Sequence, residues 1–343
     1  MIDPWFADNL VCPVDHGPLG ISANELICAA GHRYPVVDGV PVMLRGDVPQ
    51  TIGLADASLK RAIQQEHDAR APHLYLESLG ISEAEKQGGL QLDGKRGSID
   101  PVVAYLIAAT NGLMYRHLIG KLDRYPIPEI PIAPGQGRRL LDVGCSWGRW
   151  SLAASALGYD TIGVDPSLGA VMAARRVARQ LGASTRYVVG DARYLPFASG
   201  TFHDLYSYSV IQHLSEVDAR SAVVEMGRVL RTGGIAKVQM PTRFGVRCLY
   251  HQARRGFREP RDFEVRYWTL PALRRLFLSQ VGPARVSVEG FFGIGLQASD
   301  TRLMTPRLRL VLQASQRLQA VSRFLPWMAW LADSVFVEAT KTS

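Results

Sequence analysis

This sequence has few cysteines and no long apolar runs. Acidic residues are scarce in its C-terminal third. The 343 residues include only four cysteines, which are too few for a disulfide scaffold. No uninterrupted apolar run reaches the roughly 18 residues that a membrane-spanning helix needs. The opening stretch, MIDPWFADNL, has neither the basic start nor the apolar centre of a secretory signal. These absences favour a cytoplasmic enzyme over a secreted or membrane-spanning protein.

The scarcity of acids is confined to the C-terminal third. Residues 241–343 carry 16 lysines and arginines against 7 acids, whereas residues 1–240 carry 23 against 24. A basic region of this kind favours an anionic substrate, an RNA partner or a membrane surface. The alternative is that the arginines only solvate exposed helices.

Three zones of composition divide the chain. Residues 1–50 are rich in proline and glycine with short β-prone runs, which predicts a small β-rich module. Residues 51–125 have apolar residues at helical spacing, which predicts a helical linker or lid. In residues 126–343 strands and helices alternate, which predicts an α/β domain with a parallel sheet covered by helices on both faces. Strands are expected at residues 138–144, 160–165, 185–191, 202–209, 234–240, 284–292 and 333–340.

A glycine-containing turn follows the first of these strands, in LLDVGCSWGRW. A dinucleotide fingerprint would need glycine at the positions of Gly144, Ser146 and Arg149, so two of its three positions fail. A Walker loop also fails, because no Gly-Lys-Ser/Thr follows. What remains is a sharp strand-to-helix turn, in which Gly144 lets the backbone approach a ligand and Gly148 opens the helix. Such a turn suits a cofactor held by its ribose and amino-acid parts rather than by phosphates.

Acidic residues lie in register with this turn on three successive strands. Asp142 lies in the first strand, Asp165 ends the second in TIGVDPS, and Asp191 ends the third in VVGDARYLPF. A carboxylate at Asp165 can accept hydrogen bonds from both hydroxyls of a ribose, and one at Asp191 can accept from the amine of an adenine. A lone acid after a strand is more often a helix cap, but three in register predict a nucleoside-binding edge.

At this point the sequence resembles the class I S-adenosylmethionine-dependent methyltransferases, over residues 138–240. LLDVGCSWGRW is similar to the family's first motif, D-x-G-x-G-x-G, and GVDPS, GDARYLPFASGTF and RVLRTGG resemble three later motifs in the same order. Two positions depart from the pattern: Ser146 replaces the middle glycine, and His203, next to Asp204, stands where the family usually has aspartate. The resemblance implies a Rossmann-like seven-stranded sheet and S-adenosyl-L-methionine as cofactor.

The resemblance also implies the residues around that cofactor. They are Asp142, Gly144, Ser146, Gly148, Asp165, Pro166, Asp191, Ala192, Tyr208 and Gln212. Methyl transfer from a sulfonium is an in-line displacement, so positioning and desolvation can supply much of its rate. Where the acceptor must lose a proton, His213 in SYSVIQHL is the first candidate base and His251 in LYHQARR the second. A structural role for His213 is the alternative.

Two short knuckles lie in the N-terminal module, Cys12-Pro-Val-Asp15-His16 and Cys28-Ala-Ala-Gly-His32. They resemble the zinc-ribbon-like module that precedes some bacterial methyltransferases, including certain rRNA guanine methyltransferases. The metal-bearing versions have Cys-x-x-Cys in the first knuckle, and here aspartate takes the second place. Cys12, Asp15, Cys28 and His32 are therefore the candidate ligands of a structural zinc ion, with His16 as a substitute for Asp15. A metal-free fold is the alternative.

The basic C-terminal third contains two segments that bear on the acceptor. Arginines directly follow the fifth predicted strand, where α/β sheets place their ligands, so we expect them to line the acceptor cleft with His251 facing inward. A basic amphipathic stretch at about residues 300–331 predicts a helical insertion that packs on the domain or contacts a membrane surface. The arginines are Arg243, Arg247, Arg254, Arg255, Arg258 and Arg261.

The function expected from these features is methylation of a small-molecule acceptor that carries negative charge, such as a glycan, a lipid-linked compound or a natural product. The first alternative is an RNA base methyltransferase, which the module and the basic region favour. Against it, the sequence lacks an Asn-Pro-Pro-Tyr motif for base amines and a suitably placed cysteine for carbon methylation. The second alternative is a non-catalytic adaptor with a vestigial methyltransferase fold, which the intact strand-end acids disfavour.

Overall fold

The computed structural model describes residues 2–22, 24–64, 99–100, 102–103, 106–107, 122–293 and 297–342. Within this part of the chain, no helix is both long and apolar enough to cross a lipid bilayer. The predicted helical segment 51–125 is described at its start, where α2 (Gly53–Gln64) forms. Residues 65–98 of that segment lie outside the described residues.

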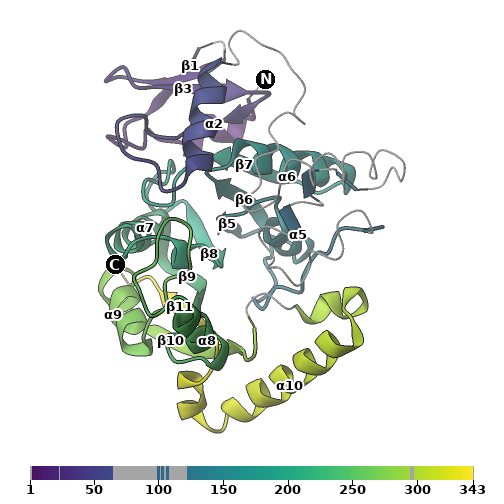
Figure 1. Cartoon of the computed structure of the whole chain (residues 1–343). Coiled ribbons are helices and arrows are strands. Elements are labelled where there is room, and N and C mark those ends of the chain that lie inside the picture. The colour runs from purple at the N-terminus through teal and green to yellow at the C-terminus, as the bar shows by residue number, and fades with distance from the viewer. Residues whose placement is uncertain are drawn as a thin grey trace.

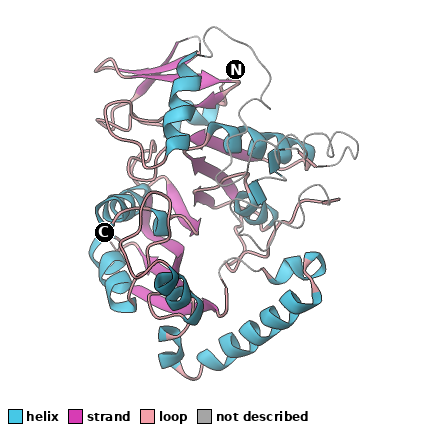
Figure 2. Cartoon of the chain, viewed as in Figure 1, coloured by secondary structure: helices cyan, strands magenta, loops and turns pink. Residues whose placement is uncertain are grey.

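A seven-stranded sheet forms the centre of the larger domain, as the sequence predicts (Figures 1 and 2). Its strands lie in the order β10-β11-β9-β8-β5-β6-β7. Neighbours from β7 to β9 are parallel, but β11 is antiparallel to β9 and β10, so the sheet is mixed rather than wholly parallel. The strands are β5 (Arg139–Val143), β6 (Asp160–Asp165), β7 (Thr185–Val189), β8 (Phe202–Tyr208), β9 (Leu230–Pro241), β10 (Ala284–Gly290) and β11 (Ser334–Thr340).

Helices flank the sheet, and several begin at a short polar side chain (Figure 2). Ser167, Ser215 and Thr269 each accept a hydrogen bond from the backbone N–H three residues further on, which satisfies a first-turn donor. The glycines at 233 and 234 predict a later end for the helix before β9, but it ends at Val229 because Leu230 is already extended. The flanking helices are α5 (Arg149–Ala156), α6 (Leu168–Gln180), α7 (Glu216–Val229) and α9 (Leu270–Gln280).

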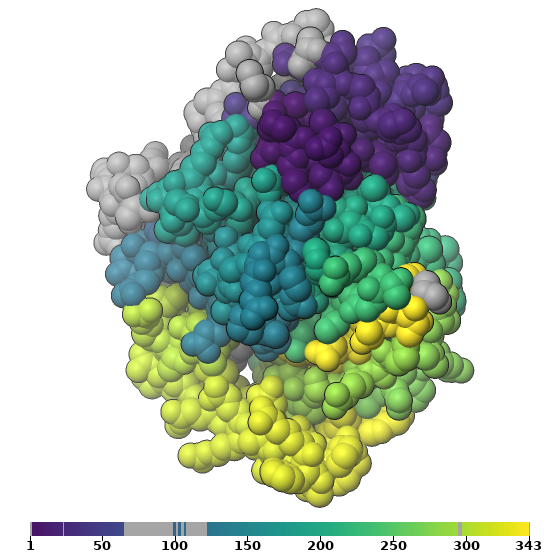
Figure 3. Space-filling view, turned by 180° about the vertical axis from the view of Figure 1, so that it is seen from behind, coloured from purple at the N-terminus to yellow at the C-terminus, as the bar shows by residue number. Residues whose placement is uncertain are grey.

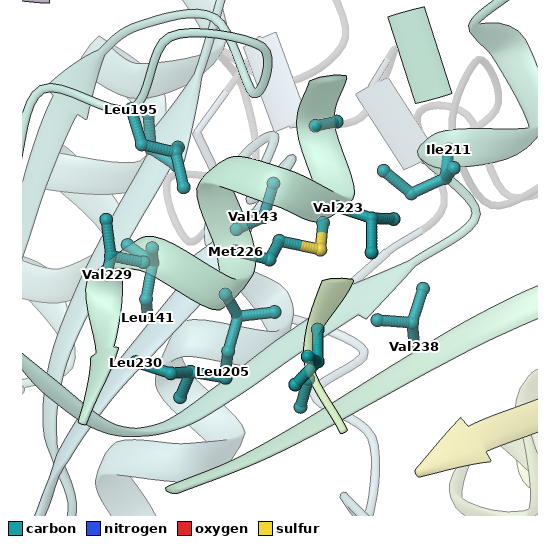
Figure 4. Close-up of a cluster of buried hydrophobic side chains, with 14 of the residues drawn as sticks. Leu141, Val143, Leu195, Leu205, Ile211, Val223, Met226, Val229, Leu230 and Val238 are labelled. Carbon is teal, nitrogen blue, oxygen red and sulfur yellow. The ribbon is translucent and has the colours of Figure 1, made fainter. Parts of the chain in front are cut away.

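Alternating side chains along β5 bury both faces of the sheet. Leu140 belongs to a buried cluster with Trp150 of α5. Leu141 and Val143 belong instead to the cluster that contains Met226 of α7, and Figure 4 shows these side chains gathered under that helix. Because successive side chains of a strand point to opposite faces, this division places α5 and α7 on opposite sides of the sheet.

The N-terminal module is a four-stranded antiparallel sheet preceded by α1 (Pro4–Asn9) (Figure 1). The residues that directly follow the last strand of the module attach the module to the larger sheet. Val42 forms a parallel bridge with Val189, the last residue of β7. The N–H of Met43 donates to the carbonyl of Val189 at 2.7 Å. The module therefore adjoins the β7 edge; its strands are β1 (Leu19–Ser22), β2 (Glu25–Cys28), β3 (Arg33–Val37) and β4 (Val40–Pro41).

The segment between β10 and β11, which includes the predicted insertion at about residues 300–331, contains helices and lies at the end of the molecule opposite the module (Figures 1 and 3). Helix α8 (Val246–Arg254), which follows β9, lies near it (Figure 1). The elements of the insertion are η4 (Ala298–Leu303), α10 (Pro306–Ser322) and η5 (Pro326–Trp330). The domain boundaries predicted after residues 50 and 125 remain predictions.

Candidate functional site

A cavity of about 410 Å³ lies where the loops after β5, β6, β7 and β8 meet. The strand order reverses here, because β6 continues on one side of β5 and β8 on the other. Ligands of open α/β sheets bind at such a switch point, and this volume is within the range of about 300–1,000 Å³ usual for small-molecule sites. Eight of the ten predicted cofactor contacts line the cavity: Gly144, Ser146, Asp165, Pro166, Asp191, Ala192, Tyr208 and Gln212.

The turn after β5 is held tightly against the neighbouring strand. Gly144 has a positive φ of 76°, and a Cβ on it would lie 2.1 Å from Val210, so only glycine fits there. Ser146 also adopts a left-handed φ of 49°, which explains why glycine is the more usual residue at its position. The buried Oγ of Ser146 has no hydrogen-bond partner among the described residues, so it can bind a polar group of a ligand.

The carboxylate of Asp165 is held in place by two backbone donors. Its Oδ2 accepts from the N–H of Ser146 and its Oδ1 from the N–H of Ser167, each at 2.9 Å. Burial raises the pKa of Asp165 to about 6, although these two hydrogen bonds lower it. An ionised carboxylate fixed in this way at the end of β6 can accept hydrogen bonds from ribose hydroxyls.

Asp191 lies in the cavity wall but is already paired with a cation. The guanidinium of Arg193 donates to both of its carboxylate oxygens, at 2.7 Å for the shortest contact. The same guanidinium donates to Asp218 at 2.9 Å and to the carbonyl of Pro49 at 2.8 Å. Arg193 thus joins the predicted adenine-binding loop both to α7 and to the end of the N-terminal module, a role that the sequence did not reveal.

Two of the predicted cofactor contacts do not line the cavity. Asp142 is fully buried in β5, where its Oδ2 accepts from the hydroxyl of Ser151 at 2.6 Å, and burial raises its pKa to about 7. It therefore supports α5 from within the sheet. A Cβ on Gly148 would lie 2.5 Å from the hydroxyl of Tyr187, so this glycine permits close packing of the α5 N-terminus rather than approach of a ligand.

His213 is the predicted catalytic histidine that does line the cavity. It ends the short helix η3 (Ile211–His213), and its ring stacks on Phe263 with 3.8 Å between centroids. Its Nδ1 lies 2.7 Å from the carbonyl of Phe263, so Nδ1 carries the proton and Nε2 is an acceptor. Burial lowers the pKa of His213 to about 4, so the imidazole is neutral at pH 7.

His251 and the six arginines do not line the cavity, although Phe263 and Val265 from the same predicted segment do. His251 lies on the exposed surface of α8 and is not among the residues that line the cavity. Arg258 pairs with Glu264 at 2.7 Å, as the alternative of a solvated surface predicts. Asp333, which adjoins the carboxyl end of β9, accepts the first-turn N–H groups of α8 and so fixes where this helix starts. None of the six arginines lines the cavity, and the expectation of an anionic acceptor loses its main support.

Other lining residues come from the two segments that were expected to cover the acceptor, the stretch after the fifth predicted strand and the predicted lid. Phe263 and Val265 lie between α8 and α9, and Ile52 and Leu54 come from the start of the predicted lid. Arg149 also lines the cavity; its guanidinium pairs with Asp300 of η4, which follows it by 151 residues in the chain. Tertiary contacts at such separations leave no local signal, so the sequence alone could not have identified them.

The four predicted metal ligands meet in the N-terminal module. The ligand atoms of Cys12, Asp15, Cys28 and His32 all lie within 4.8 Å of one another. Nδ1 of His32 is 3.4 Å from Sγ of Cys12 and 3.2 Å from Sγ of Cys28. A tetrahedral zinc ion with bonds of about 2.0–2.3 Å places its ligand atoms about 3.3–3.8 Å apart, so the set fits such an ion.

The alternative ligand His16 lies outside this cluster. Its Nε2 faces Glu225 of α7 at 4.0 Å. The sulfur of Cys12 is also 3.1 Å from the hydroxyl of Tyr34, a partner of the kind that orients a metal-bound thiolate. All four candidates are protein side chains, so the site resembles a closed, structural centre rather than a catalytic one.

Comparison with known proteins agrees with both parts of this architecture. Residues 140–234 match the family described as "Methyltransferase domain", and residues 6–39 match the family described as "Trm112p-like protein". The ubiquinone biosynthesis O-methyltransferase of Azorhizobium caulinodans is 33% identical over 86 residues, which are 25% of this chain and 34% of the relative. The 2-methyl-6-phytyl-1,4-hydroquinone methyltransferase of Synechocystis is 28% identical over 156 residues, 45% of this chain and 44% of the relative.

The chain thus spans less than half the length of these two relatives. Among solved structures, a chain from the complex of the Haloferax volcanii Trm112 methyltransferase activator aligns with a TM-score of 0.45 and 14% identity, covering 77% of this chain and 100% of its own length. The motifs and family matches coincide along the sequence: a class I S-adenosylmethionine-dependent methyltransferase domain carries the cavity, and a Trm112p-like module precedes it.

Proposed function

We propose that this protein transfers a methyl group from S-adenosyl-L-methionine to a hydroxyl group of a small, largely apolar acceptor. The observation that carries this proposal is the convergence of eight predicted cofactor contacts on one cavity at the switch point of the sheet. Asp165, with its fixed carboxylate, and Ser146, with its unpartnered hydroxyl, provide acceptors and a donor for the ribose and amino-acid parts of the cofactor.

The cavity wall supports a compact apolar acceptor over an RNA chain. Aromatic and aliphatic side chains such as Trp150, Leu106, Phe263 and Val265 line it. The one arginine among the described lining residues, Arg149, is already paired with Asp300. An RNA strand would require free cations along its phosphates, and a wall of this kind does not offer them. Two relatives are named for O-methylation in ubiquinone biosynthesis and for methylation of a phytyl hydroquinone, and a hydroxylated ring with an apolar tail is compatible with this wall.

The side chains around the cavity position the acceptor more than they activate it. Bound in this cavity, S-adenosylmethionine would supply an electrophilic methyl group to the acceptor oxygen, with S-adenosylhomocysteine as the leaving group and the hydroxyl proton passing to solvent. Nε2 of His213 accepts from the side-chain amide of Gln212 at 3.2 Å while Nδ1 donates to the carbonyl of Phe263, so an acceptor hydroxyl would have to displace that amide to bind His213. Its low pKa makes it a weak base, so orientation of the oxygen and exclusion of water are its main contributions.

The test supplies the protein with radiolabelled S-adenosylmethionine and, separately, an organic-solvent extract or total RNA. We expect label in the extract, loss of that labelling in Asp165→Ala, and unchanged labelling in the control His251→Ala, whose side chain lies outside the cavity. Label in RNA alone would establish the RNA alternative. Binding of the cofactor without transfer to either fraction would favour the adaptor.

A further inference from the structure

Two chain segments that are far apart in sequence bring exposed apolar side chains together at the end of the molecule opposite the module. One is the start of α8, and the other is the stretch from the end of α10 through η5 (Figure 1). The ring centroids of Phe244 and Trp330 lie 6.2 Å apart, which joins the two segments. We define the α8–η5 surface by its apolar members Phe244, Val246, Phe324, Leu325, Trp327 and Trp330.

The apolar side chains of this surface are strongly exposed although they are large. Phe324 is 84% exposed, Trp327 59% and Val246 56%. Single exposed apolar residues are common on proteins, but a group of exposed aromatic rings on two segments that are in contact usually marks an interaction site. The α8–η5 surface is therefore a candidate contact surface for something outside the chain.

The backbone beneath the surface is held firmly. Asp333 is fully buried, and its Oδ1 accepts from the N–H groups of Arg247 and Cys248 at 2.7 and 3.0 Å, which caps α8. Its carbonyl accepts from the N–H of Thr242 at 3.1 Å, and Met328 of η5 is buried. Because both segments are fixed to the sheet near Asp333, the exposed rings are presented at fixed positions.

The charge around the surface has one sign. No aspartate or glutamate occurs between residues 301 and 332 or between residues 226 and 258. The acids that bound the insertion, Asp300 and Asp333, are both buried. Exposed cations are present on both segments, in the side chains of Arg243, Arg247, Arg254, Arg317 and Arg323.

We propose that the α8–η5 surface docks on an anionic lipid bilayer. Tryptophan and phenylalanine are suited to the boundary between lipid headgroups and acyl chains, and the exposed arginines of the same two segments attract lipid phosphates. A two-fold dimer through this surface would place these arginines against their own copies with no acid to neutralise them. A nucleic acid would bind the arginines but would gain little from exposed aliphatic side chains such as Val246 and Leu325.

The direct test is co-sedimentation of the full chain with lipid vesicles. One set contains phosphatidylcholine only, and the other contains phosphatidylcholine mixed with phosphatidylglycerol. We expect binding to the mixed vesicles that weakens with added salt, and much weaker binding to phosphatidylcholine alone. In Phe324→Ala/Trp327→Ala the partition coefficient on mixed vesicles should fall by about tenfold or more, because two interfacial side chains are removed.

Two further pairs of substitutions test the contribution of charge and provide a matched control. Arg317→Glu/Arg323→Glu should weaken binding to mixed vesicles at low salt by about tenfold or more, since each substitution replaces an attractive charge by a repulsive one. Ile63→Ala/Val217→Ala removes apolar side chains that are equally exposed, at 57% and 75%, on α2 and α7, and should bind as the unchanged protein does. Cofactor binding measured by calorimetry establishes that each variant is folded.

Three results would overturn the proposal. The first is no binding of the unchanged protein to mixed vesicles. The second is light scattering that shows a dimer which Phe324→Ala/Trp327→Ala dissociates, without any binding to vesicles. The third is vesicle binding that the control pair weakens as much as the aromatic pair does. None of these outcomes depends on methyl transfer, so the proposed function is tested separately.

Discussion

Arg149 and Asp300 form an ion pair of 3.2 Å, buried to 6% and 1% exposure, between the first turn of α5 and the insertion before β11. Arg149 also lines the cavity, so this pair connects the cofactor-binding turn with the segment that leads into the α8–η5 surface. A buried ion pair contributes little net stability when intact, but loss of one partner leaves a charge in a nonpolar surrounding.

We expect Asp300→Ala to lower the free energy of unfolding by about 3–5 kcal/mol, because the guanidinium of Arg149 would stay buried without its partner. Urea denaturation followed by far-ultraviolet circular dichroism measures this change. The control is Arg33→Ala, which breaks the pair with Glu25 at 2.8 Å, where the arginine is 66% exposed; we expect less than about 1 kcal/mol. Equal effects of both substitutions would show that the Arg149–Asp300 pair is not buried in solution.

Replacement of Asp165 by alanine should weaken cofactor binding by about tenfold or more. Each charge-assisted hydrogen bond to a ribose hydroxyl contributes roughly 1.5–3 kcal/mol, and calorimetric titration measures the loss. Asp160→Ala is the matched control, because Asp160 lies at the opposite end of the same strand, where it pairs with Arg186. An unchanged affinity in Asp165→Ala would remove this residue from the cofactor site.

The pKa of Asp165, raised to about 6 by burial, also predicts how cofactor affinity depends on pH. Ribose hydroxyls donate to the ionised carboxylate, so binding favours the deprotonated form. Affinity should be constant above pH 7 and should decrease as the pH falls below about 6, where the carboxyl becomes protonated. Asp165→Asn should bind weakly without this dependence. His213 should not contribute a titration in this range, because its pKa lies at about 4.

Ser146→Gly should affect stability and binding in opposite directions. A non-glycine residue in the left-handed region costs roughly 1–2 kcal/mol, part of which glycine offsets by its greater freedom in the unfolded chain, so we expect a gain of up to about 1 kcal/mol. Loss of the hydroxyl should weaken cofactor binding up to about tenfold. The control is Gln136→Gly, which relieves a φ of 51° in an exposed turn and should leave cofactor affinity unchanged.

The N-terminal cluster predicts a bound metal. Protein purified without chelator should contain about one zinc ion per chain, and Cys12→Ser should release it and lower the melting temperature. Elemental analysis and thermal denaturation measure both effects. His16→Ala should retain the metal, because His16 faces Glu225 instead of the cluster. A chain that holds no transition metal would mean that the module folds around its own small core, which includes Leu26, Cys28 and Tyr34.

Local patterns were sufficient to predict the seven strands, and the turns that follow several of them meet at one cavity. The strand pattern is local because successive residues of a strand face opposite helix layers, as Leu140 and Leu141 do in β5. The end of α7 was less predictable. The glycines at 233 and 234 favour a later end, but the extended backbone at Leu230 begins pairing with Phe202 of β8. That pairing is a tertiary contact, and it overrides the local signal.

Local patterns could not predict where a side chain lies when its position depends on contacts with residues far away in the sequence. The arginines after β9 follow a strand at its carboxyl end, yet none of the six lines the cavity. Asp142 fits the cofactor motif, but its side chain points into the protein toward Ser151. In both cases the motif gives the position of a residue along the chain and not the direction of its side chain.

The bridge between Val42 and Val189 has a consequence for solubility. β7 is an end strand of the seven-stranded sheet, and an unpaired end strand offers backbone donors and acceptors to any other chain. The segment after β4 occupies part of that edge through the hydrogen bond from Met43 to Val189. If the N-terminal cluster holds its module together through a metal, then removal of the metal uncovers the edge. The concentration of available zinc would then decide whether this protein stays dispersed or assembles into aggregates through its own β-sheet.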